Sequence, residues 1–228
     1  MPNNITSFDI GESQVKVVTL SGGSVKKAVA LELPDNVVSG GTVLSMDALA
    51  DFLKEKLRAS GPIKKDAAVI LPDSLVFARN ITVPPMTDAQ LSYNLPFEFK
   101  DYLTQEKSRY YFDYAVQGTE KDESGETTGL RLFACATLKK TVEDYRAMFY
   151  RAGYKLKLAL PEEAAFGNLA ALHAKTAPGD EDLCIVDIGH KGIRMFIYRD
   201  GHFRTHRAVD LGLWDLEQLL SSERGVDP

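Results

Sequence analysis

The chain has 228 residues, of which 44% are hydrophobic and 26% charged, so its composition is that of an ordinary globular protein with a sizeable core. The formal net charge of -5 gives no basic footprint and argues against nucleic-acid binding. No apolar run reaches membrane-spanning length, and "MPNNITSFDI" lacks the basic and apolar parts of a signal peptide, so we expect a cytoplasmic protein.

The first third of the chain predicts a hairpin over 5–20 and 25–33, then an amphipathic helix that Ser45 caps. "DAAVILP" and "SLVFARNITVP" follow as short strands. A second helix begins at Thr87, which has the capping-box spacing with Gln90. Because Pro96 lies inside this helical pattern, we expect a kink or break near 94–97.

The middle of the chain predicts a second hairpin, from "RYYFDYAVQG" and "GLRLFACATL". A helix, the strand "YKLKLALP" and the helix "EEAAFGNLAALHAK" come next, and "TAPGDED" then breaks the pattern as the best candidate for a boundary. Cys135 and Cys184 each lie in a strand-like apolar run without a metal-ligand spacing, so we expect buried, reduced thiols.

One unit occurs twice: an apolar strand, an Asp-Ile-Gly turn and a returning strand, in "FDIGESQVKVV" and again in "VDIGHKGIRMFIY". A glycine in such a turn lets backbone N–H groups approach a phosphate, and an aspartate at the strand end can hold magnesium through water. Two facing hairpins would therefore clamp a nucleotide. The candidate nucleotide-binding residues are Asp9, Gly11, Glu12, Ser13, Lys16, Asp187, Gly189 and Lys191.

Asp9 and Asp187 are the candidate magnesium residues, although an aspartate at a strand end also satisfies turn N–H groups by itself. The two glycines serve a tight turn whether or not phosphate binds, and Lys16 equally suits a solvent-facing strand. His190 has no nucleophile or carboxylate partner recognisable from sequence, so no catalytic residue is predicted. The basic stripe around His202 and His206 is read as a solvated face.

A group of aromatic residues surrounds the second predicted helix and the hairpin that follows it. Most of them must pack the core of a small subdomain, but they are more numerous than one helix and one hairpin should bury. We therefore expect some of them to line a groove that is open to a partner. The candidate partner-binding residues are Tyr93, Phe97, Phe99, Tyr102 and Tyr110.

The two Asp-Ile-Gly hairpins resemble the phosphate loops of the actin-like ATPase superfamily. Within it, "LPDSLVFARNITVPPMTDAQLSYNLPFEFKDYL" and the later Asp113-Tyr114 pair are similar to the PilM family of type IV pilus assembly. The resemblance implies an α/β fold of the actin-like (ribonuclease H-like) kind with a small inserted α/β subdomain, as in FtsA. The implied parts are 1–82 (first actin-like subdomain), 83–160 (inserted subdomain), 161–178 (closing helix) and 179–228 (start of a second half).

The resemblance also implies a scaffold that captures the cytoplasmic tail of an inner-membrane partner, PilN, in a groove beside the inserted subdomain. Attachment to the inner membrane would then be indirect, ATP with magnesium is the implied cofactor, and the adenine-binding part would follow residue 228. Glu12 stands where the family's first loop often has Ser or Thr, and His190, Lys191 and Gly192 replace small and hydroxyl residues in the second. We therefore expect nucleotide binding to be weak or lost, and hydrolysis with it.

Two other functions stay open at this point. An active actin-like ATPase would be stabilised against heat by magnesium and ATP. A cytoplasmic scaffold of type II secretion would share the architecture without using nucleotide, and fold analogy alone does not separate these functions.

Overall fold

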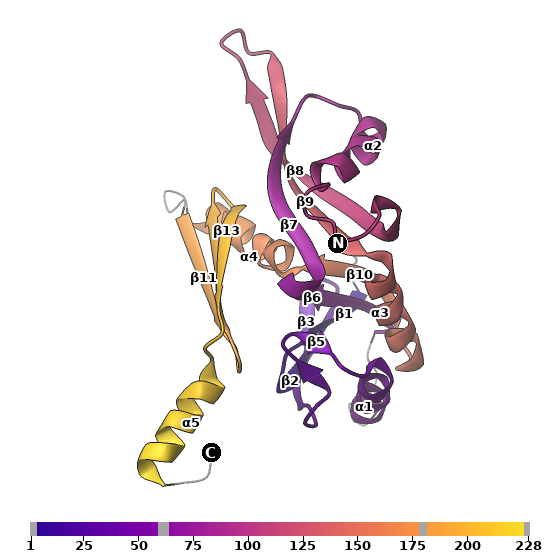
Figure 1. Cartoon of the computed structure of the whole chain (residues 1–228), viewed down its shortest axis with the longest axis vertical. Helices are drawn as coiled ribbons and strands as arrows, with labels where there is room; N and C mark the ends of the chain where they lie inside the picture. The colour runs from indigo at the N-terminus through magenta and orange to yellow at the C-terminus, as the bar shows by residue number, and fades with distance from the viewer. Residues whose placement is uncertain (1–3, 59–63, 178–181, 226–228) are drawn as a thin grey trace.

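The computed structural model describes residues 4–58, 64–177 and 182–225 (Figure 1). Its largest sheet has five strands, in the order β10-β6-β1-β2-β3. β1 and β2 form an antiparallel hairpin, whereas β6 pairs in parallel with both β1 and β10, which leaves β10 at one end of the sheet. The strands are β1 (Asn4–Ile10), β2 (Gln14–Ser21), β3 (Ser24–Glu32), β6 (Asp66–Leu71) and β10 (Lys155–Pro161).

Two helices, α1 (Met46–Arg58) and α3 (Lys139–Arg151), pack together on one face of this sheet and form the main core with it. Phe8 of β1 is buried at the centre of that core, with its ring edge-on to Phe149 of α3 at 4.8 Å between centroids. The buried face of α1 has the four-residue spacing of an amphipathic helix. It consists of Leu49, Ala50, Leu53 and Leu57.

A second sheet is inserted between β6 and α3, with the strand order β7-β9-β8 and the helix α2 on one face. The hairpin of β8 and β9 reaches beyond α2 (Figure 1). β8 is an end strand of this sheet, as β10 is of the first. The inserted elements are η1 (Asp73–Leu75), β7 (Val76–Val83), α2 (Asp88–Glu98), η2 (Lys107–Arg109), β8 (Tyr110–Lys121) and β9 (Thr127–Leu138).

The helix α4 (Glu162–Thr176) follows β10 without a loop and connects the first sheet to a third one, of order β11-β12-β13. Phe196, Tyr198 and Phe203 are buried where this sheet packs against α4. The helix α5 extends away from the sheet (Figure 1). These elements are β11 (Asp182–Ile188), β12 (Ile193–Arg199), β13 (His202–Val209) and α5 (Leu213–Arg224).

A short hairpin completes the fold. The hairpin of β4 (Val38–Ser39) and β5 (Thr42–Val43) turns at Gly40 and Gly41, both in the left-handed region with φ of 56° and 70°. Among the described residues, no helix is both long enough and apolar enough to cross a bilayer.

The N-terminal caps of α1 and α2 are those that the sequence predicts. The hydroxyl of Ser45 accepts the N–H of Ala48 at 3.2 Å, and Thr87 and Gln90 form the predicted capping box. The break expected near Pro96 is absent, because α2 continues to Glu98. Pro96 lies two residues before the end of the helix, so its missing N–H interrupts the ladder only in the last turn.

The prediction for the cysteines is half right. Cys135 is mostly buried, and burial raises the pKa of its thiol to about 11, so the thiol stays protonated. Cys184 is exposed, contrary to the prediction, because it lies on the face of the third sheet opposite α4, where no described segment covers it. The boundary predicted at 178–179 lies outside the described residues, and the division into subdomains stays a prediction.

Candidate functional site

The two Asp-Ile-Gly turns have the same geometry. The N–H of Gly11 donates to the carbonyl of Gln14 at 2.9 Å, and the N–H of Gly189 donates to the carbonyl of Gly192 at 2.9 Å. A Cβ on Gly189 would lie 2.9 Å from that carbonyl oxygen, so the turn itself requires glycine. The strand pairs that close the two turns are Ile10 with Val15 and Ile188 with Ile193.

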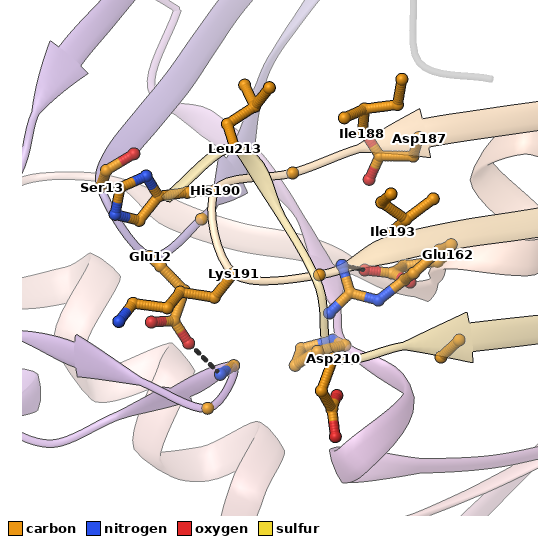
Figure 2. Close-up of a pocket in the computed structure, with 18 of the residues that line it drawn as sticks. Glu12, Ser13, Glu162, Asp187, Ile188, His190, Lys191, Ile193, Asp210 and Leu213 are labelled. Carbon is orange, nitrogen blue, oxygen red and sulfur yellow. Dashed lines mark hydrogen bonds and ion pairs between the residues drawn. The ribbon is translucent and has the colours of Figure 1, made fainter. Parts of the chain in front are cut away.

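The two turns face a common cleft of about 570 Å³ (Figure 2). All eight candidate nucleotide-binding residues line it, together with the Gly40–Gly41 turn. The walls carry seven Asp or Glu side chains and three Lys or Arg side chains, so acidic groups outnumber basic ones. The carboxylates are Asp9, Glu12, Asp73, Glu162, Asp187, Asp210 and Glu217, and the cations are Lys16, Lys191 and Arg194.

The two candidate magnesium residues have different partners. Asp9 forms an ion pair with Lys16, directly opposite it in the hairpin, at 3.2 Å between Oδ2 and Nζ. Asp187 is opposite Arg194 in the second hairpin, but Arg194 pairs with Glu162 of α4 at 3.4 Å. Within the described ranges, no three His, Cys, Asp or Glu side chains are grouped to hold a metal ion. The metal role of the two aspartates stays a prediction.

The start of α5 fixes the second turn. The N–H of Leu213 donates to the carbonyl of Gly189 at 3.0 Å, and the N–H of Trp214 donates to the carbonyl of His190 at 2.9 Å. The ammonium of Lys191 lies 3.7 Å from the centroid of the Trp214 ring, a cation–π contact. The carbonyl groups of Gly189 and His190 and the ammonium of Lys191 therefore already have partners within the protein.

Glu162, at the first position of α4, is one of the cleft residues that the sequence did not point to. Its side chain is only 13% exposed, and its Oε2 atom is buried without a hydrogen-bond partner among the described residues. Burial raises the pKa of its carboxyl to about 7, against the lowering effect of Arg194. Both Glu162 and its partner Arg194 line the cleft.

The next residue, Glu163, ties α4 to the third sheet. Its carboxylate lies 3.1 Å from Nδ1 of His206 on β13, and its backbone carbonyl accepts the hydroxyl of Tyr198 at 2.7 Å. Glu163 is 3% exposed, and this burial raises the pKa of its carboxyl. His206 was read as part of a solvated stripe, but it faces inward because Phe203, on the same face of β13, packs under α4.

A second concave site lies between the first sheet and the inserted sheet. It is an apolar groove of about 440 Å³, bordered by β8 on one side and β10 on the other. α3 and α4 contribute to its walls, and Asp113 and Arg146 are its only charged lining residues among those described. We call it the β8–β10 groove. Its lining residues are Tyr111, Phe112, Asp113, Tyr114, Ala115, Phe133, Cys135, Thr137, Val142, Arg146, Ala159, Leu160, Pro161 and Ala164.

The five candidate partner-binding aromatics lie outside this groove. Phe99 and Tyr110 are buried in the core under α2. Tyr93, Phe97 and Tyr102 are exposed, and two of them carry a cation on the ring: Lys107 at 3.9 Å from Phe97, and Arg79 at 4.6 Å from Tyr102. A contact between these exposed rings and a partner stays a prediction. The aromatics that line the groove are instead Tyr111, Phe112, Tyr114 and Phe133.

Comparison with known families gives one match over almost the whole chain. The family described as "Type IV pilus assembly protein PilM" matches residues 7–227. No curated protein is close enough in sequence to match.

Comparison with solved structures identifies the fold. The "PilM-PilN type IV pilus biogenesis complex" superposes with a TM-score of 0.80 at 21% identity, over 98% of this chain and 66% of that one. The cytoplasmic domain of EpsL, an inner-membrane component of the type II secretion system of Vibrio cholerae, gives a TM-score of 0.55 at 16% identity over 98% and 76%. The ethanolamine utilization protein EutJ from Carboxydothermus hydrogenoformans gives 0.55 at 15% identity over 99% and 58%. The fold is therefore actin-like, and the chain spans just under two thirds of its PilM counterpart.

Proposed function

Because the chain belongs to the family of the type IV pilus assembly protein PilM, we propose that it is a cytoplasmic scaffold which holds a PilN-like inner-membrane partner in the β8–β10 groove. The membrane attachment is then indirect, through that partner. The observation that carries the proposal is an apolar groove bordered by two sheet-end strands.

The groove suits an extended peptide segment. β8 contributes five consecutive residues, 111–115, and has a neighbouring strand on one side only. Such an edge offers backbone N–H and C=O groups to an added strand, while the pockets beside it select side chains. β10 offers the same on the opposite wall. A flexible cytoplasmic tail can therefore gain backbone hydrogen bonds and bury apolar side chains in one step.

One backbone N–H group on the edge strand β8 already donates a hydrogen bond to a side chain of the same strand. The carboxylate of Asp113 accepts the N–H of the next residue, Tyr114, at 2.8 Å. An edge strand that is capped in this way is protected from pairing with an unwanted strand. We propose that a partner strand on β8 displaces this carboxylate, which then faces solvent or Arg146 across the groove.

Two features of the cleft argue against tight binding of the cofactor that the resemblance implies. The N–H groups of Gly11 and Gly189 are used inside their own turns, and the wall carries seven carboxylates against three cations. A nucleotide triphosphate needs the opposite balance of charge and free N–H donors. We therefore propose a scaffold that does not depend on hydrolysis, with nucleotide binding weak or lost.

Calorimetric titration with the cytoplasmic tail peptide of the organism's PilN-like protein tests the partner site. Saturable binding is expected for the unmodified chain. Ala115→Trp should weaken binding at least about 100-fold, because Ala115 lines the groove and the indole would occupy the space of the bound peptide. Val116→Trp is the matched control: it is the next residue on β8, 56% exposed and outside the groove lining, and should bind like the unmodified chain.

Equal weakening by both tryptophan variants would mean a general disturbance of β8 and would contradict the groove as the binding site. Absence of binding by the unmodified chain would contradict the proposed partner itself.

A further inference from the structure

Glu12 connects the first glycine turn to a distant part of the chain. Its Oε1 atom accepts the backbone N–H of Gly41 at 2.9 Å, across 29 positions of sequence. Gly41 lies in the left-handed turn of the β4–β5 hairpin, which forms part of the cleft wall. The side chain is half-buried, and Figure 2 shows it directed into the cleft with this hydrogen bond dashed.

The position of the Glu12 carboxylate in the first glycine turn indicates what its hydrogen bond with Gly41 does. Glu12 directly follows Gly11, at the position from which a glycine turn presents its backbone to a bound phosphate. A carboxylate, like a phosphate, offers negatively charged oxygens that only accept hydrogen bonds. Glu12 thus makes within the protein the kind of contact that a phosphate oxygen makes with the N–H of a glycine loop.

The charged residues near Glu12 also disfavour the binding of a phosphate group. Lys191 is the cation of the opposite turn and reaches into the same part of the cleft in Figure 2, but its ammonium lies over the ring of Trp214. Lys16 is paired with Asp9. Both lysines of the two turns are therefore already engaged with other groups, and an incoming polyphosphate would meet the Glu12 carboxylate at close range, where like charges repel.

We propose that Glu12 is a built-in anion, which occupies the phosphate position of the cleft, holds the β4–β5 hairpin closed over the first turn and excludes polyphosphate. The cleft then keeps a closed shape without any nucleotide. This inference depends on the cleft alone and not on the β8–β10 groove, so the partner proposal and this one can fail independently.

Glu12→Ser is the decisive variant, since it removes the carboxylate and leaves a small hydroxyl. The probe is tripolyphosphate with magnesium, which needs the two turns and no base pocket, titrated by calorimetry and by the fluorescence of Trp214, the chain's one tryptophan. We expect no saturable binding to the unmodified chain at millimolar probe and at least tenfold tighter binding to Glu12→Ser. Glu12→Gln, which keeps an acceptor for Gly41 without the charge, should lie between them. Glu32→Ser, the same change on an exposed strand position, should behave like the unmodified chain.

A second measurement addresses the hairpin without any ligand. Hydrogen exchange at the Gly41 amide should be at least tenfold faster in Glu12→Ser than in the unmodified chain, while amides of the five-stranded sheet exchange as before. The proposal is overturned if tripolyphosphate binds the unmodified chain and Glu12→Ser equally, if neither binds it, or if exchange at Gly41 does not change.

Discussion

Replacing Phe99 with alanine is expected to lower the free energy of unfolding by about 3–5 kcal/mol, the usual cost of removing a fully buried ring. The Phe99 side chain is 0% exposed and packs with Phe112 of β8 at 5.8 Å between ring centroids. Phe99 also directly follows α2 and packs this end of the helix onto the inserted sheet. Urea denaturation followed by circular dichroism gives the free energy directly, with the slope of the transition checked against the unmodified chain.

Tyr93→Ala is the matched control, on the helix α2 that Phe99 caps. Its ring is 73% exposed, so the expected change is within about 0.5 kcal/mol. A Phe99→Ala variant that unfolds like the unmodified chain but loses the PilN-like peptide would contradict the core role and place the ring at the partner interface instead.

The contrast between Phe99 and Tyr93 shows how much of the inserted subdomain can be predicted from the sequence. The presence of an aromatic-rich subdomain follows from composition and spacing, but the sorting of its rings does not. One face of β8 is packed under α2 and the other lines the open groove, so Tyr110 is 3% exposed whereas its neighbour Tyr111 is 41% exposed. Alternation along a strand predicts that the two differ, and only the tertiary packing decides which of them reaches the groove.

The glycine turns were predictable for a different reason. A strand, an Asp-Ile-Gly turn and a returning strand are specified within about fifteen residues, and the hydrogen bonds that close both turns are local. The contact of Glu12 with Gly41 is not local, and nothing in the spacing of the two residues predicts it. The same is true of the pair formed by Glu163 and His206.

The first turn of α4 is the place where these non-local contacts meet. Glu162 borders the cleft, Pro161 and Ala164 border the β8–β10 groove, and Glu163 reaches β13. In the sequence, the helix dipole fully explains two acidic residues at the start of a helix. Glu162 and Glu163 therefore give no sign that this turn borders two sites. One helical turn therefore contacts both candidate sites and the third sheet, and a change at Glu162 can be measured at each of them.

Glu162→Gln is expected to stabilise the protein in a pH-dependent manner. The folded state retains the Glu162 proton up to a pH of about 7, because burial raises its pKa, whereas the unfolded chain releases it near the ordinary value of 4.5. The unfolded state thus binds fewer protons between these values, so the stability of the unmodified chain falls as the pH rises through them. Glutamine does not titrate. The gain in unfolding free energy of the variant should therefore grow by about 2 kcal/mol between pH 5 and pH 8.

Urea titrations of both chains at pH 5, 6, 7 and 8 measure this gain. Glu143→Gln, the same change at an exposed position of α3, should give a difference that is flat within about 0.5 kcal/mol over the range. A flat difference for Glu162→Gln as well would mean that Arg194 keeps the carboxylate ionised throughout. The ion pair would then outweigh the burial of Glu162, and its carboxylate would be one more fixed negative charge in the cleft that Glu12 also lines.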